Sequence, residues 1–218
     1  MKLLTKTFTI LATSLLVAAT ALANNYRVDT THSEIAFKVS HLGISTMTGY
    51  FNDFSTSFDL DPETKSVDTH VEDRDRHLKS ADFFDVESYP EIRFTSKRAE
   101  VVSKNKVKLH EDLSIRGVTK PVVLDVEFKG AATGPMGYQR AAFVASTTIN
   151  RKDFGVSWNK TLDTGGFVGG EDVRIQLELE AISIENTDSR MYLSPQTAPN
   201  SPKREEKVSR GRHASAVG

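Results

Sequence analysis

Charged side chains and one histidine crowd into residues 74–79, with the sequence RDRHLK, and two phenylalanines follow at residues 83–84. Guanidinium and imidazole groups donate hydrogen bonds to an anionic or carbonyl group. The pattern indicates a short polar helix that covers an apolar space, with Arg74 and His77 as donors. Composition alone favours a plainer alternative, a solvated helix whose two phenylalanines fill the core.

Histidine is the residue type that would most directly indicate a metal site. No two of the histidines have the i,i+4 or alternate spacing that aims two imidazoles at one ion, and the chain has no cysteine. We therefore predict no metal. In the THS sequence, His32 is expected to cap or orient a turn. His41 could meet the polar end of a ligand, although a structural role is the alternative. The six histidines are His32, His41, His70, His77, His110 and His213.

Signals for covalent catalysis or phosphate binding are missing from the sequence. The chain has no G-x-S-x-G motif and no thiol, and the carboxylates of residues 73–85 lie among Arg and Lys that can pair with them. The glycine-rich residues 165–170 lack the lysine of a phosphate loop and fit a hairpin better. No cofactor is predicted.

The first 23 residues have the three parts of a secretory signal peptide. Lys2 and Lys6 precede an apolar stretch at residues 8–19, and the sequence ALA at 21–23 fits a cleavage site. We expect cleavage after Ala23, export to the periplasm and no stable membrane anchor. The chain has no cysteine, so an exported form relies on its core rather than on disulfides.

Charge and composition divide the remaining chain into two parts. Residues 24–185 carry 20 Lys and Arg against 26 Asp and Glu, an acidic balance that argues against nucleic-acid binding. Residues 186–218 are rich in Pro, Ser, Arg and Lys, so we expect a disordered tail. That tail could be a basic surface-binding arm, but an inert extension is favoured.

Alternation with a period of two recurs through the central part. It is clear at residues 35–41, 124–128 and 173–180, and turn residues at 61–62, 104–105, 130–137, 165–166 and 169–170 separate such runs. No long helical pattern appears. The sequence therefore predicts an all-β antiparallel fold, although alternation alone does not distinguish a sandwich from a barrel.

Four sequence motifs, in the expected order along the chain, resemble those of the YceI-like family of exported polyisoprenoid-binding proteins. The resemblance implies an antiparallel, lipocalin-like barrel of about eight strands with a short helix, which holds an isoprenoid or related long-chain lipid. The motifs are DTTHSEIAFKVSHLGIS at 29–45, RDRHLKSADFFDVESYPEIRF at 74–94, LSIRGVTKPVVLDVEF at 113–128 and TTINRKDFGVSW at 147–158.

Two features depart from the family pattern. The tail after residue 185 is unusual, and residues 63–66 replace a longer segment that usually includes a strand. The barrel is therefore expected to lack one strand, with either a gap at that edge or neighbouring segments that cover it. An open edge would weaken both closure and ligand retention.

The resemblance and the inward parity of the strands together suggest a ligand site. For the head group we predict Arg74, His77 and Arg116 as donors. For the apolar interior of the barrel we predict Phe37, Val39, His41, Phe94, Leu124, Val126, Phe128 and Phe143.

The expected function is that of a periplasmic, non-catalytic carrier for an isoprenoid lipid or a quinone. One alternative is an enzyme that acts on the same lipid with His41 or His77 as general base. Another is a stress-protective protein with a filled core and no ligand. A homodimer is left open.

Overall fold

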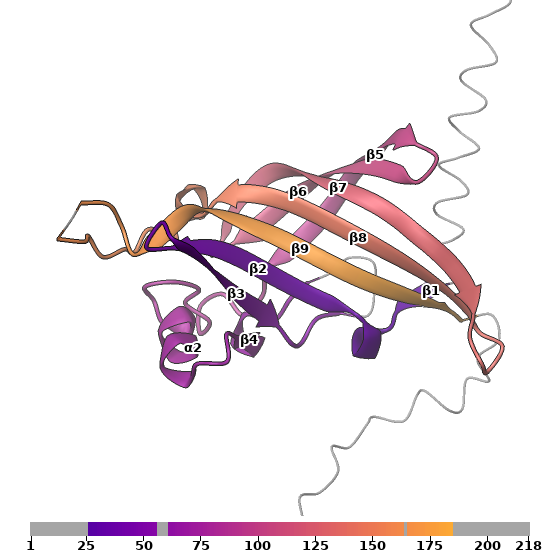
Figure 1. Ribbon diagram of the computed structural model, residues 1–218, viewed down its shortest axis with the longest axis horizontal. Helices are drawn as coiled ribbons and strands as arrows, with labels where there is room; N and C mark the ends of the chain where they lie inside the picture. The colour runs from indigo at the N-terminus through magenta and orange to yellow at the C-terminus, as the bar shows by residue number, and fades with distance from the viewer. Residues whose placement is uncertain (1–25, 56–60, 164, 185–218) are drawn as a thin grey trace, which may run out of the picture. The chain divides into compact units, whose positions relative to one another are not determined.

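The protein is described by a computed structural model, which covers residues 26–55, 61–163 and 165–184 (Figure 1). The chain divides into two units, Met1–Asn186 and Thr187–Gly218, and every described residue belongs to the first. The expected signal peptide, its cleavage after Ala23 and the expected C-terminal tail lie outside the described residues.

The described residues form one antiparallel sheet in the order β4-β3-β2-β9-β8-β7-β6-β5, with β1 also paired to β9. Within the described residues, the strands are joined by one α-helix, α2 (Glu72–Lys79), and by three short 3-10 helices, η1 (Thr30–His32), η2 (Thr64–Ser66) and η3 (Arg151–Phe154). The strands are β1 (Tyr26–Val28), β2 (Glu34–His41), β3 (Ser45–Phe51), β4 (Val67–Asp68), β5 (Arg93–Ser103), β6 (Lys106–Ile115), β7 (Val118–Thr133), β8 (Gln139–Asn150) and β9 (Gly169–Ser183).

The predicted antiparallel β fold with one short helix is confirmed. Strand β9 shows why the alternation was informative: Ile175 and Leu177 are buried on the inner face, while Arg174 and Gln176 point the other way. In Figure 1 the sheet is strongly twisted and curved, and α2 lies at one end of it, below β2 and β3. No helix in the described part of the chain is long and apolar enough to cross a membrane.

Strand pairing does not close the sheet. Among the described residues no strand ladder joins β4 to β5, but an isolated bridge pairs Glu63 with Glu91. On either side of it the Thr64 amide donates to the Pro90 carbonyl at 2.8 Å, and the Ile92 amide to that of Pro62 at 3.0 Å. The shortened segment thus folds as η2, and its neighbours cover the gap that the missing strand would leave.

The β6–β7 hairpin shows how local sequence sets the register. Arg116 and Gly117 have φ values of +50° and +72°, the combination of a two-residue type I′ turn, and Ile115 pairs with Val118 across it. A side chain at Gly117 would also meet Tyr89, whose ring lies 2.8 Å from the position of a Cβ. The turn therefore requires glycine both for conformation and for space.

Two of the predicted turns lie wholly or partly in strands: residues 134–137 turn as predicted, but residues 130–133 and the pair at 169–170 belong to strands. Gly130 is part of β7, where a β-bulge between Phe128 and Gly130 lets the strand continue to Thr133. Gly169 and Gly170 begin β9, and a side chain at Gly170 would lie 3.1 Å from the Cβ of Ser40. Glycine marks a bend or a close approach within these strands rather than their ends.

Candidate functional site

A cavity of about 330 Å³ lies beside α2, on the inner face of the sheet. Most of its wall is apolar, and three aromatic rings pack together in it. The centroid of the Phe37 ring lies 5.6 Å from that of Phe51 and 6.4 Å from that of Phe84, and the last two are 5.7 Å apart. Two of the rings come from neighbouring strands, and Phe84 comes from the segment after the helix.

The ring of Phe37 reaches this position because the residue opposite it is glycine. Phe37 on β2 pairs with Gly49 on β3, and a Cβ at Gly49 would lie 2.3 Å from the ring. It would also lie 2.9 Å from the side chain of Thr69. A strand glycine covered by an aromatic ring from the next strand thus shapes this wall of the cavity.

Arg74 joins α2 to the sheet at the wall of the cavity. Its Nε donates to the hydroxyl of Thr69 and its Nη2 to the Thr69 carbonyl, both at 2.7 Å. The carboxylate of Asp75 accepts hydrogen bonds from the amide, at 2.8 Å, and the hydroxyl of Thr69. These bonds fix the first turn of the helix and leave a cationic group in the lining of the cavity.

His77, one turn further along α2, lies between two aromatic rings. Its Nε2 is 2.9 Å from a carboxylate oxygen of Asp82, and its ring meets Trp158 edge-on at 4.6 Å and Phe83 at 5.0 Å. The His77 side chain is 39% exposed, and Trp158 is also exposed in part. The cavity therefore reaches the surface beside these two residues, and we call this side its mouth.

Arg151 is a buried cation in the lining of the cavity. Its Nε donates to the carbonyl of Gly170, and its Nη1 to the carbonyls of Val156 and Trp158, each at 2.8 Å. Burial lowers the pKa of the guanidinium, and the charge of Glu171 partly opposes this. The sequence reasoning missed Arg151, although the motif at residues 147–158 contains it.

The structure brings five of the predicted site residues together. The lining of the cavity includes Phe37, Val39 and His41 from β2, and Arg74 and His77 from α2. Arg116 lies outside the lining. Its Nη1 donates to the carbonyl of Phe83 at 2.8 Å and to that of Gly155 at 3.4 Å, so the side chain holds two loops.

The other predicted apolar residues do not line this cavity. Phe94 and Leu124 are buried, and Val126 packs against the core. Phe128 and Phe143 pair across β7 and β8 with ring centroids 5.5 Å apart, and Phe128 is 39% exposed.

A single bore through all of these residues was therefore the wrong expectation. Along the inner face of β9, Ile175 lines the cavity, Leu177 is fully packed, and Leu179 lies opposite Phe143. The packed side chains of the middle separate the cavity from the half-exposed end. Inward parity identifies the face of a strand but not the position along it.

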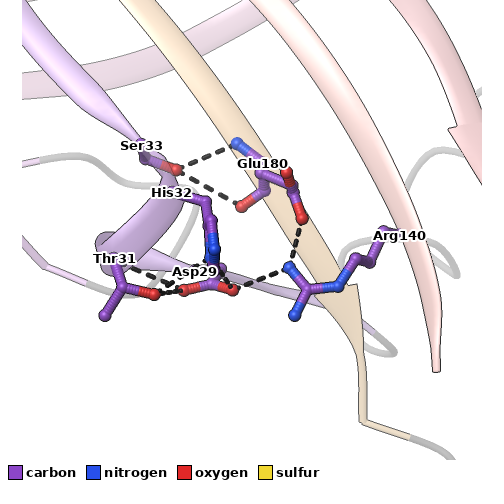
Figure 2. A network of polar contacts seen from close by, with 6 residues as sticks. All are labelled: Asp29, Thr31, His32, Ser33, Arg140 and Glu180. Atoms are coloured by element: carbon purple, nitrogen blue, oxygen red, sulfur yellow. Dashed lines mark hydrogen bonds and ion pairs between the residues drawn. The ribbon is translucent and has the colours of Figure 1, made fainter. Parts of the chain in front are cut away.

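A polar network ties the N-terminal strands to β9 and β8 (Figure 2). Asp29 caps η1 by accepting from the amide of Thr31 at 3.1 Å, and its other oxygen lies 2.9 Å from Nδ1 of His32. Nη1 of Arg140 donates to Asp29 at 2.8 Å and also to Glu180. His32 was expected to cap or orient this turn; the cap is Asp29, and His32 contacts the carboxylate of that residue.

The same network contains three groups that could ligate a metal, Asp29, His32 and Glu180. The guanidinium of Arg140 donates to both carboxylates, so each of them is already paired with a cation. Burial raises the pKa of Asp29, but the bonds from Thr31, His32 and Arg140 outweigh it and hold that pKa well below its usual range. The arrangement is that of a structural ion-pair cluster.

Comparison of the sequence with known proteins identifies a family and several bacterial relatives. A family model described as the YceI-like domain matches residues 26–181. A UPF0312 protein of Pseudomonas putida is 38% identical over 181 residues, which cover 74% of this chain and 94% of the relative. A UPF0312 protein of Staphylococcus epidermidis is 37% identical over 174 residues, which cover 74% and 98%.

Two solved structures share the fold. The YceI protein of Campylobacter jejuni is 33% identical with a TM-score of 0.55, and the match covers 71% of this chain and 95% of that one. A polyisoprenoid binding domain from Saccharophagus degradans has a TM-score of 0.54 at 16% identity, over 73% of this chain and 98% of that one. At this low identity, the similarity to the Saccharophagus degradans domain shows a shared fold and nothing more.

Proposed function

Because the chain belongs to the YceI-like family, we propose that it is an exported periplasmic protein that binds an isoprenoid lipid or quinone without transforming it. The observation that carries this proposal is the apolar cavity beside α2, which has cationic and imidazole groups in its wall. The name of the Saccharophagus degradans domain supports the same ligand class.

The volume of the cavity limits the size of the ligand that it can hold. Small-molecule sites occupy roughly 300–1,000 Å³, and this cavity of about 330 Å³ lies at the lower end of that range. A short prenyl chain would fill it. Burial of the chain against the three phenylalanine rings would contribute roughly 25 cal/mol per Å². The head group would then lie near Arg74 and His77.

An enzyme that acts on the same lipid is the second candidate, and the His77–Asp82 contact is the observation that favours it. A carboxylate that orients an imidazole at the wall of a cavity is one requirement of a general base. Against it, His41 has no hydrogen bond to a carboxylate within the described residues. Replacement of His77 by Gln would leave a carrier able to bind its lipid, whereas an enzyme would lose turnover.

The test begins with the lipid that the protein carries. Protein isolated from the expressing cell is analysed by native mass spectrometry, and its lipid is extracted and identified. Farnesol, a short prenol, is then titrated into lipid-free protein. Saturable binding and a chemically unchanged prenol are expected, and the absence of both bound lipid and saturable binding would refute the proposal.

Two substitutions locate the ligand. Phe37→Asp places a carboxylate in the cavity wall and should abolish binding, whereas Phe128→Asp changes a half-exposed ring outside it and should not. Val39→Phe reduces the volume without adding a charge, and it serves where Phe37→Asp fails to fold. Equal loss of binding in Phe128→Asp and Val39→Phe would mean that the ligand does not bind in the cavity beside α2.

A further inference from the structure

Large apolar side chains are exposed on two segments that border the mouth of the cavity. Leu42 and Ile44 lie in the turn between β2 and β3, and Ile44 is 86% exposed. Trp158 and Phe167 lie on the segment between η3 and β9, and Phe167 is 49% exposed. Exposed apolar side chains that gather in one region mark a surface that another apolar phase covers.

Hydrogen bonds join these two segments into one surface. The amide of Leu42 donates to the carbonyl of Val168 at 2.8 Å, and Val168 and Trp158 both line the cavity. Thr161 and Phe167 form a β-bridge, so residues 161–163 and 165–167 make the two sides of a small hairpin. In Figure 1 this hairpin projects beyond the end of the sheet, beside the turn between β2 and β3.

The charges in this region fit the surface of a bilayer. Residues 39–52 contain no Asp, Glu, Lys or Arg, in a chain of which 26% is charged. Charges of both signs stand on the neighbouring segment: Nζ of Lys152 lies 5.6 Å from the centre of the Phe167 ring and pairs with Glu171, while Lys160 precedes the hairpin and Asp163 lies in it. Tryptophan and lysine beside exposed aliphatic groups are typical of the membrane interface.

We infer that the turn Leu42–Ile44 and the side of the hairpin that carries Phe167 insert into the surface of a lipid bilayer and hold the cavity mouth against it, an inference that rests on the proposed function of the cavity. An isoprenoid resides in the apolar layer of a membrane. Contact at the mouth lets the prenyl chain pass between that layer and the cavity without crossing water. The transfer then avoids exposing the apolar surface of the chain to water, which is its largest free-energy cost.

A protein partner is the alternative occupant of the same surface. Hot spots of protein interfaces are usually ringed by polar groups that can pair across the contact. Here the stretch at 39–52 offers no charged side chain for such pairing, and the exposed groups surround the entrance of an apolar cavity. The bilayer is therefore the occupant that these residues fit best.

The position of the single tryptophan makes the inference directly measurable. Trp158 is the only tryptophan of the chain and lies at the mouth, so its fluorescence reports contact with lipid. The full chain, purified as the cell releases it, is mixed with phosphatidylcholine vesicles whose acyl chains carry bromine. We expect a blue shift and quenching of Trp158, together with flotation of the protein with the vesicles.

A matched pair of substitutions identifies the contact surface. Ile44→Asp should weaken partitioning into vesicles by about tenfold or more. Met136→Asp changes a side chain of similar exposure in the β7–β8 turn, at the opposite end of the strands, and should have no effect. Equal weakening in both variants, or none in Ile44→Asp, would overturn the inference.

Two further outcomes separate this inference from the proposed function. Neither Ile44 nor Met136 lines the cavity, so both variants should bind farnesol in solution as the wild type does. Flotation without farnesol binding would keep membrane docking and refute the lipid site. Quenching without flotation would mean that single lipids enter the cavity from solution, and flotation that requires an added protein would favour a protein partner. Both of these results would refute membrane docking.

Discussion

Nη1 of Arg151 donates a hydrogen bond to the backbone carbonyl of Trp158 at 2.8 Å. A buried cation at the end of β8 thus holds the aromatic residue at the mouth of the cavity. The same guanidinium also binds the carbonyls of Val156 and Gly170, so it joins the loop after η3 to the start of β9. Its role is to fix the shape of the wall, since Nε and Nη1 donate three hydrogen bonds to backbone carbonyls.

Replacement of Arg151 should therefore loosen the mouth and destabilise the fold. Arg151→Ala leaves three carbonyls without their donor, and we expect a loss of about 2–4 kcal/mol in the free energy of unfolding. Urea unfolding followed by Trp158 fluorescence measures it. Arg76→Ala, which removes an exposed guanidinium of α2 with two surface ion pairs, is the control and should cost less than about 1 kcal/mol. Similar losses in the two variants would contradict the role assigned to Arg151.

Gly49→Ala should disturb the cavity from the sheet side. The added methyl group would lie 2.3 Å from the ring of Phe37, so the ring must move. Overpacking of this kind costs about 1–3 kcal/mol, and the displaced ring should also weaken farnesol binding. In Gly134→Ala the nearest atom is 3.4 Å away, so this control should be nearly neutral. Phe37→Leu should restore part of the stability of Gly49→Ala, and failure to do so would show that another contact decides the cost.

The Asp29 network should make stability depend on acid pH. The pKa of Asp29 is lower in the folded protein than in the unfolded chain, where it is about 4. The carboxylate therefore stabilises the fold above that value, and the stabilisation is lost as the pH falls below it. Asp29→Asn should cost about 2 kcal/mol at pH 7 and less at pH 2.

Urea unfolding of wild type and variant at several pH values measures this difference. Asp73→Asn is a suitable control, because Asp73 pairs only with Arg76 at the exposed surface of α2 within the described residues. Its effect should be small at every pH. A difference between wild type and Asp29→Asn that stays constant from pH 7 to pH 2 would mean that the carboxylate has an ordinary pKa.

Arg74 should distinguish charged from neutral head groups. If the head group lies beside this cation, Arg74→Gln should weaken binding of a prenyl phosphate by about tenfold or more and that of farnesol by no more than about twofold. Gln can still donate to Thr69, which limits the structural change. Isothermal titration of both ligands gives the two ratios. Arg98→Gln, on the exposed strand β5, is the control, and equal losses for both ligands would indicate that Arg74 acts only through the fold.

The sequence predicted the sheet better than it predicted the site. Alternation at residues 35–41 correctly gave the inner face of β2, where Phe37, Val39 and His41 line the cavity. Phe128 shares this parity, yet it lies beyond the packed middle of the sheet, and spacing along a strand carries no information about where a cavity ends.

The sequence did not predict the burial of Arg151 or the bridge between Glu63 and Glu91, for another reason. Each depends on contacts between segments far apart in sequence: Arg151 binds carbonyls up to 19 residues away, and Glu63 pairs with Glu91. A lone arginine after a strand gives no sign that it will be buried. The helix was easier to recognise, because residues 74–84 combine a polar run with aromatic residues that could cover an apolar space.

The pairing of Tyr26 with Ser183 places the two ends of the domain side by side. Both attachment points lie at the far end of β9 from Gly169, where the strand meets His41 near the mouth. A short peptide between these ends would turn the domain into a closed ring without threading any loop, and new ends could be opened at the exposed β7–β8 turn. The fold is therefore suited to circular permutation, and a reporter joined directly at Tyr26 or Ser183 would be attached away from the entrance.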